Sequence, residues 1–259
     1  SSAGTTSFSA SYGSEFWSGT VKAATLAFTN TGSTLTDLWS TDTTLTAQFT
    51  GAGWNTGRVV VTWNKDHPTS ARGVPFRVGN LSTGMKAALD TSFVAGDDSS
   101  NYLNYLRGDK SNEVATTSGL HVYRTRTSPL GDIVNSKLVL SSPPKMPYTE
   151  AYNVGYAQFK TDQVARTPLV LFGSNDGMLH ALNGSSTGTN AGKEVFAYIP
   201  AQTYYGPDGT TTAQASANGL AAIGNPAYEH RYYVDATPQV FDIDFKKTNG
   251  STLSDNTWK

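Results

Sequence analysis

The sequence predicts an all-β protein, and the architecture that fits its strands best is a β-propeller. The chain is divided into about ten short apolar or β-branched runs, and clusters of Gly, Pro, Asn, Asp and Ser separate them. Helical spacing is visible over one short segment, residues 81–89, which also contains Gly84. A closed propeller needs roughly four to eight blades of four strands, and about ten strands make two to three blades. We therefore expect residues 1–259 to form an incomplete ring that further polypeptide completes.

The expected strands follow one another closely along the chain. After a lead-in over residues 1–15, which already contains the first of them, strands are predicted at 8–12, 19–30, 58–63, 119–126, 137–140, 169–172, 178–182, 195–199, 232–234 and 240–245. Residues 30–57 are interpreted as a long polar connection with a short element, residues 202–225 as a polar loop, and the aromatic run 102–106 as a strand.

The last expected strand has one apolar face. Phe241, Ile243 and Phe245 alternate with Asp242 and Asp244, and alternate residues of a strand point to the same side. In an incomplete ring this face is the one we expect to be exposed and open to association.

Residues 166–200 form the clearest blade. The apolar run Leu169–Phe172 is followed by Ser174-Asn175-Asp176-Gly177, and Asn, Asp and Gly accept the positive φ of tight hairpins. A second apolar run covers 178–182, a second turn region covers 183–192, and a third run covers 195–199 before Pro200. Three short runs joined by two turns predict an antiparallel meander, which is most of one propeller blade.

Composition limits the classes of partner and chemistry. Charged residues are 15% of the chain, against about 25% in typical soluble proteins, and the net charge of −1 gives no electrostatic case for nucleic acid or an anionic membrane. The chain contains no cysteine, which excludes disulfides, thiolate metal sites and a cysteine nucleophile. No apolar run approaches the ~20 residues of a membrane span. The N-terminal segment SSAGTTSFSA has neither the basic nor the apolar region of a signal peptide.

Several motifs together resemble one known family. GSNDGMLHALNGSSTG followed by KEVFAYIP resembles the blade motif of quinoprotein-like propellers. Further stretches occur in a matching order, namely Phe16-Trp17-Ser18-Gly19, Tyr105–Asp109 with Glu113, Leu130–Ser136 and Tyr228–Asp235. With the blade, they resemble the C-terminal β-propeller domain of the PilC/PilY family, the tip-associated adhesins of type IV pili. The resemblance extends over residues 16–245.

The resemblance implies a function. A member of this family is expected to be a non-enzymatic surface protein that serves pilus biogenesis, twitching motility and cell adhesion. It would lie outside the bacterial cell, at the pilus tip and associated with the outer membrane. Its implied partners are minor pilins, the remaining propeller polypeptide and a receptor that the sequence does not identify. No cofactor is predicted: members of the family can bind calcium, but the acidic calcium loop is not recognisable in this sequence.

Arg107-Gly108-Asp109 is the candidate adhesion motif, because this tripeptide is the one that integrins recognise. The competing interpretation is structural. An arginine and an aspartate on either side of a glycine turn can pair with each other and brace the turn, and we prefer this interpretation. It predicts that Asp109→Ala would leave the arginine without its acidic partner.

Other candidate sites are weaker. Asn175-Asp176-Gly177 could begin a calcium loop, but apolar residues follow where a metal loop needs oxygen ligands, so a hairpin turn is preferred. The histidines are His67, His121, His180 and His230, and none has metal-ligand spacing. His180 lies between apolar residues and is expected to be a hydrogen-bonded packing residue. No Gly-x-Ser-x-Gly elbow is present.

Two other functions compete with adhesion and pilus assembly. The blade motif alone also permits a quinoprotein-like dehydrogenase that uses pyrroloquinoline quinone. Such an enzyme needs a complete ring around an axial cofactor and metal, and dye reduction in the presence of the quinone and calcium would identify it. The third interpretation is a bare structural scaffold that contacts no host surface.

Overall fold

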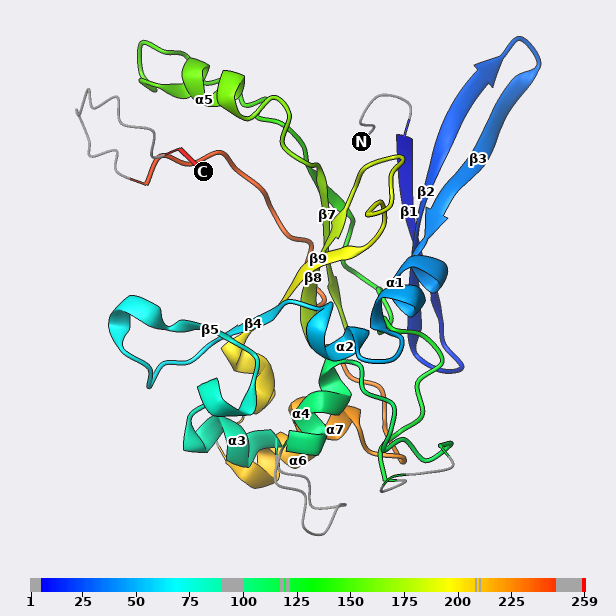
Figure 1. Ribbon diagram of the computed structural model, residues 1–259, viewed down its shortest axis with the longest axis vertical. Coiled ribbons are helices and arrows are strands. Elements are labelled where there is room, and N and C mark those ends of the chain that lie inside the picture. Colours follow the sequence, from blue (N-terminus) through cyan, green and yellow to red (C-terminus); the bar gives the residue numbers. More distant parts are fainter. Residues whose placement is uncertain are drawn as a thin grey trace.

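The computed structural model describes residues 6–89, 100–116, 119, 122–207, 209, 211–245 and 258–259, and two sheets organise them. In Figure 1 a long hairpin projects from one upper corner, an arm extends from the other, and helices gather at the lower end of a central sheet. Within these residues neither sheet closes into a ring, which agrees with the prediction of an incomplete propeller.

The smaller sheet is antiparallel, in the order β1 (Thr6–Gly13), β2 (Ser18–Thr29) and β3 (Gly32–Ser40). The half of this sheet that lies next to the rest of the protein is buried, because Val21 and Ala23 pack against the helix that follows β3. Its far half stands in solvent, where the side chains of Phe28 and Leu35 are 80% and 66% exposed. The predicted strands 8–12 and 19–30 are therefore confirmed, and β3 adds a strand where a connection was expected.

The larger sheet has the order β5-β4-β9-β8-β7-β6. Its strands are β4 (Val60–Trp63), β5 (Gly73–Pro75), β6 (Val139–Ser141), β7 (Leu169–Ser174), β8 (Met178–Asn183) and β9 (Glu194–Ile199). β7 to β9 form the antiparallel meander of three strands that the segment 166–200 predicts, and β6 pairs with β7 as a fourth antiparallel strand of the blade. β4 then adds to β9 in parallel, so the first part of the chain shares the sheet of the blade.

Helices are more numerous than the sequence indicated. They are α1 (Thr41–Phe49), α2 (Gly53–Thr56), α3 (Thr83–Leu89), α4 (Ser100–Arg107), α5 (Tyr156–Asp162), α6 (Thr212–Asn218) and α7 (Leu220–Ile223), with 3-10 turns at Thr69–Ala71, Val78–Asn80 and Ala201–Tyr204. The segment 81–89, where helical spacing was visible, does contain α3, but the other helices were not predicted from the sequence. No helix among the described residues is both long and apolar enough to cross a membrane.

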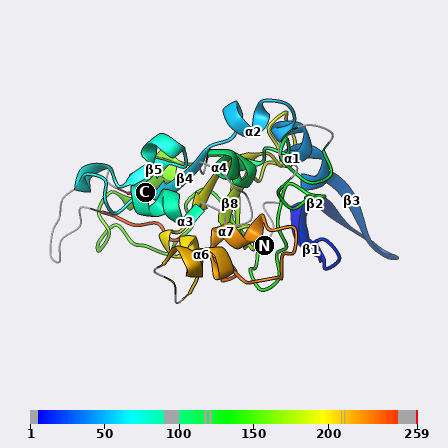
Figure 2. The same cartoon turned by 90° about the horizontal axis from the view of Figure 1, so that it is seen from below.

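The missed helices have local causes. In the run 102–106, Tyr102, Leu103 and Leu106 have the spacing of one helix face, and all three are buried. In the presumed loop 202–225, Thr211 and Gln214 form a capping box that begins α6. These helices close the lower end of the sheet (Figures 1 and 2), and together with β4 and β9 they enclose the main apolar core.

Three predicted strands do not form as expected. The segment 119–126 lies partly outside the described residues, and Tyr123 makes only an isolated bridge to Glu113. At 232–234 the Tyr233 backbone N–H donates to the side-chain oxygen of Asn175, so a turn takes the place of a neighbouring strand. The segment 240–245 makes an isolated bridge with the C-terminal residues.

The alternation at 240–245 is confirmed even though the sheet is not. Phe241, Ile243 and Phe245 are 55%, 46% and 73% exposed, whereas Asp242 is buried and accepts a hydrogen bond from the Tyr156 hydroxyl at 2.7 Å. Tyr156 belongs to a small aromatic cluster with Phe159 and Trp258, which fixes the arm that carries α5.

The exposed apolar strip predicts association. Residues 1–259 expressed alone should self-associate in light scattering, because clustered aromatic and aliphatic side chains in water favour contact with a second surface. Ile243→Lys places a charge at the centre of the strip and should return the mass to that of a monomer. Asp244→Lys on the other face is the control. A folded monomer in all three proteins would contradict this prediction.

Candidate functional site

Arg107 ends α4 in the interior of the protein. The residue is 1% exposed, and its guanidinium donates to the backbone carbonyl oxygens of Asn55 and Arg58 at 3.1 Å and of Trp54 at 3.3 Å, with a weaker contact to Phe76 at 3.4 Å. Burial and the nearby positive charges of other arginines lower the pKa of Arg107 to about 10. Its role in the structure is to tie α4 to α2 and to the segment that leads into β4.

The predicted pairing of Arg107 with Asp109 was wrong. The carboxylate of Asp109 instead accepts from the backbone N–H of Ser111 at 2.9 Å. Gly108 between them has φ of 118°, a left-handed conformation that favours glycine, and a Cβ there would lie 3.2 Å from Trp54. The turn therefore separates the two charged side chains, directing Arg107 inward and leaving Asp109 near the surface. Adhesion through this tripeptide stays a prediction.

Arg126 stabilises the loop after α4, a role that was expected of pairing within the tripeptide Arg107–Asp109. Its guanidinium donates to the carbonyl oxygens of Tyr105 at 2.6 Å and Asp109 at 2.8 Å, and pairs with Glu113 at 2.8 Å. The guanidinium also lies 3.8 Å from the centre of the Tyr105 ring. These contacts hold the loop after α4 in one position.

A groove of about 370 Å³ lies between this loop and the first two helices. Its floor is aromatic, from Phe49 and Trp54, and its rim carries the opposite charges of Asp109 and Lys110. Exposed Thr46 of α1 forms the facing wall. An apolar floor with a few polar groups at the rim is typical of binding sites for small molecules or peptide side chains.

A network of buried charges lies behind the groove. Arg58 donates to both oxygens of Glu194, at 2.7 and 3.0 Å. On its other side Glu194 receives His180 Nδ1 at 2.9 Å, and His180 Nε2 lies 3.1 Å from Asp176. The side chains of His180 and Glu194 are fully buried. The network therefore contains two cations, Arg58 and His180, and two anions, Asp176 and Glu194, so its charges balance. Its members come from β8, β9, the turn before β8 and the segment that leads into β4.

The network changes the acidity of its members. Burial alone would lower the pKa of His180, but the carboxylates of Asp176 and Glu194 outweigh it and raise this pKa to about 9. Burial would raise the pKa of Glu194, and Arg58 and His180 instead lower it to about 2. The prediction of His180 as a hydrogen-bonded packing residue is confirmed, with an ionic partner on each side.

The family-like motifs meet at one point. Asp132, in the run 130–136, accepts from the Asn175 amide and lies 2.8 Å from His230 Nε2. The ring of His230 stacks on Trp17 with 3.9 Å between centres. Three separated stretches, which contain Trp17, Asp132 and His230, therefore meet at the Asn175-Asp176-Gly177 turn of the blade, and this turn is a structural junction. Gly177 has φ of 91°, as the preferred hairpin interpretation requires.

The described part of the chain offers no group of side chains that could bind a metal ion. No cluster of three or more His, Asp or Glu side chains with the geometry to hold a metal ion occurs there. His121 lies outside the described residues.

Comparison with known proteins places these motifs in a family. The profile of the PilY1 beta-propeller domain matches residues 130–253. A type IV pilus biogenesis factor PilY1 homolog from Xylella fastidiosa is 33% identical over 217 residues, which cover 77% of this chain. The chain belongs to the PilY1 β-propeller family. The type IV pilus biogenesis factor PilY1 of Pseudomonas aeruginosa strain UCBPP-PA14 is 29% identical over 244 residues, or 88% of this chain. No solved structure matches the chain.

The chain spans 16% of the length of the Xylella relative and 18% of the Pseudomonas relative. The family profile begins at residue 130, close to the junction around Asp132, and includes the blade β7 to β9. That residues 1–129 belong to the same domain is a proposal of ours, supported by β4, which pairs with β9 in the larger sheet.

Sequence reasoning missed the buried network and the groove. The spacing of Asp176 and His180, four residues apart across a turn, was the one local signal of the network. Arg58 and Glu194 are 136 residues apart, and only the parallel addition of β4 to β9 brings them together. The groove combines α1, which was expected to be a polar connection, with the loop after α4.

Proposed function

We propose that this chain is the propeller portion of a type IV pilus biogenesis factor that acts at the bacterial surface without enzyme chemistry. The observation that carries the proposal is the relationship to the Xylella homolog over 77% of the chain. The proposed position is outside the cell, at the pilus tip and associated with the outer membrane, and the proposed partners are minor pilins and further propeller polypeptide.

Surface attachment is a second proposed role, and the groove favours it. A pocket of about 370 Å³ with an aromatic floor and a charged rim is suited to holding a side chain of a partner. Arg126 and Gly108 fix the loop that forms one wall, so the groove is preformed. A preformed site loses less conformational entropy on binding than a loose one does.

The test separates these two roles. In a bacterium that carries this gene and makes type IV pili, loss of the gene should sharply reduce the amount of pilin that can be sheared from the cells. The intact gene should restore it. Unchanged piliation in the deletion strain would contradict the role in pilus biogenesis.

Attachment is tested with two point variants of the restored gene. Thr46→Tyr fills the groove from an exposed position, whereas Ala47→Tyr on the same helix does not line it. Both strains should make normal amounts of surface pili. We expect attachment to fall roughly tenfold with Thr46→Tyr alone, the loss of about 1.4 kcal/mol of binding. Normal attachment of the Thr46→Tyr strain would favour the bare scaffold.

A further inference from the structure

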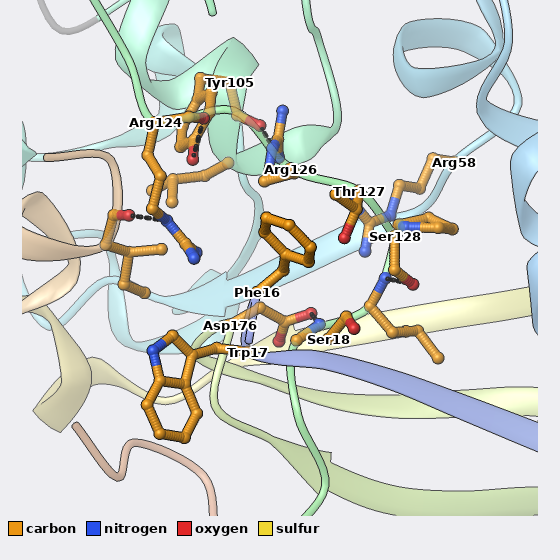
Figure 3. Close-up of a pocket in the computed structure, with 15 residues that line it drawn as sticks. Phe16, Trp17, Ser18, Arg58, Tyr105, Arg124, Arg126, Thr127, Ser128 and Asp176 are labelled. Atoms are coloured by element: carbon orange, nitrogen blue, oxygen red, sulfur yellow. Dashed lines mark hydrogen bonds between the residues drawn. The ribbon is translucent and has the colours of Figure 1, made fainter. Parts of the chain in front are cut away.

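A second and narrower cavity lies between the turn that joins β1 to β2 and the segment 124–131 (Figure 3). Phe16 and Trp17 come from the turn, and Arg124 and Ser128 come from the facing segment. In Figure 3 the guanidinium of Arg124 points toward the Phe16 ring, which is 51% exposed at the mouth. The cavity is distinct from the groove beside Asp109, although both are bordered by Arg126 and Ser128.

The charges around this cavity are paired except at Arg124. Arg58 is bound by Glu194, and Arg126 by Glu113. Asp176, the acidic residue of the lining, is bound by His180 and by the backbone N–H of Gly131. These pairs leave no net charge on that part of the lining.

Arg124 is held in place by contacts that do not neutralise it. Its Nε donates to the carbonyl oxygen of Ile223 at 3.0 Å, and its guanidinium lies 4.5 Å from the centre of the Tyr228 ring. The Tyr105 hydroxyl also interacts with the Arg124 side chain, but it carries no charge, and no carboxylate in the described part of the chain forms a salt bridge with Arg124. A half-buried guanidinium that is positioned but not paired can bind an anion with both terminal N–H groups.

The turn opposite Arg124 is strained. Trp17 has φ of 50° and is the one non-glycine residue with positive φ in the described part of the chain. A bulky residue in this conformation is strained, and such strain is concentrated at functional sites. The stacking of Trp17 on His230 holds the turn in this conformation and so keeps Phe16 at the mouth of the cavity.

We propose that this cavity binds a carboxylate presented by a partner protein, with Arg124 as its bidentate ligand and Phe16 packing on the segment that carries it. The enclosed space is about 30 Å³, which is room for about two water molecules or the two oxygens of a carboxylate. The planar fork of Arg124 matches a planar carboxylate.

The aromatic mouth favours a polypeptide over a free small anion. Phe16 can bury apolar surface only against a ligand that continues outward from its carboxylate. The carboxylate could belong to a glutamate side chain or to a chain terminus, and the test includes both. This site is inferred independently of the pilus role, so either proposal can fail alone.

The probes are blocked pentapeptides titrated into the protein. Acetyl-Ala-Ala-Glu-Ala-Ala-amide should shift the Nε–H NMR resonance of Arg124, and so should alanine pentapeptide with a free C-terminus if a terminus is accepted. The same peptide with glutamine for glutamate should not. Arg124→Gln should weaken binding of the glutamate peptide roughly tenfold, about 1.4 kcal/mol.

Arg231→Gln is the matched control, because it removes the same charge from an arginine that pairs with exposed Glu229 outside the cavity. It should change binding less than about twofold. If Arg124→Gln does not fold, the resonance shift in the unaltered protein decides. Equal shifts with the glutamine peptide, unchanged affinity in Arg124→Gln, or equally tight binding of acetate alone would overturn the proposal.

Discussion

Glu194→Gln should lower the free energy of unfolding by about 3–5 kcal/mol, the cost of removing one partner from a buried ion pair. Glutamine keeps the shape of the side chain but leaves the positive charges of Arg58 and His180 facing each other across a neutral group. Water cannot solvate the positive charges that lose their partner, because the side chains of Glu194 and His180 are fully buried. Urea unfolding at pH 6 measures this difference.

Glu229→Gln provides the control for the chemistry of the substitution. Glu229 also pairs with an arginine, at 3.8 Å, but its side chain is 85% exposed. Surface pairs contribute about 0–1 kcal/mol, so this variant should remain close to the unaltered protein. Equal effects of the two variants would show that the buried network does not stabilise the fold.

The network also predicts how stability depends on pH. The pKa of Glu194 is lowered to about 2 by Arg58 and His180 against the effect of burial, so its contribution is lost as pH falls below its ordinary value of 4.5. The pKa of His180 is raised to about 9 by its carboxylate partners, so its contribution is complete below 6.5 and is lost as pH rises toward 9. We expect the free energy of unfolding to be largest between pH 4.5 and pH 6.5. In Glu194→Gln it should decrease less as pH rises from 6.5 toward 9, because His180 has lost one of its two carboxylate partners.

The blade was predictable because its signals are local. Pro168 and Gly173 bound one apolar run, and the Asn-Asp-Gly turn fixes how the next run returns. β7, β8 and β9 pair in sequence order, so no long-range information is needed to place them. The resemblance to known blades added the family, but turn chemistry alone predicts the meander.

The helices and the run 240–245 were harder to predict from the sequence, because tertiary packing decides which secondary structure they adopt. Tyr102 and Leu103 are as compatible with a strand as with a helix, and only burial in the core between helices and sheet selects α4. The run 240–245 alternates as a strand does, yet it meets only the C-terminal residues and joins no sheet. Alternation predicts which side chains share a face, and it does not supply a neighbouring strand.

The candidate site was predictable in part. The tripeptide Arg107–Asp109 directed attention to one wall of the groove, but its local sequence suggested a pairing that the left-handed Gly108 prevents. The opposite wall comes from α1, which is more than 50 residues earlier in the chain. Such a site depends on which distant segments pack together, and a single sequence does not contain that information.

Arg107→Lys should lower the free energy of unfolding by about 2–4 kcal/mol, although it keeps the charge of the tripeptide. A lysine cannot donate to the carbonyl oxygens of Trp54, Asn55 and Arg58 at once, and a buried carbonyl left without a donor, such as that of Arg58, costs about 1–3 kcal/mol. Part of this cost is offset, because the buried Arg107 Nε has no hydrogen-bond partner among the described residues and lysine has no such group.

Asp109→Ala should cost less than about 1 kcal/mol, because Asp109 loses a single hydrogen bond to the Ser111 backbone in a half-exposed turn. Melting temperature and attachment to integrin-bearing cells are measured for both variants. If the tripeptide is structural, Arg107→Lys lowers the melting temperature, and Asp109→Ala leaves attachment unchanged. Abolished attachment of a stable Asp109→Ala protein would establish the adhesive role, and Asp109 would then act without Arg107, whose guanidinium is bound to the backbone inside the protein.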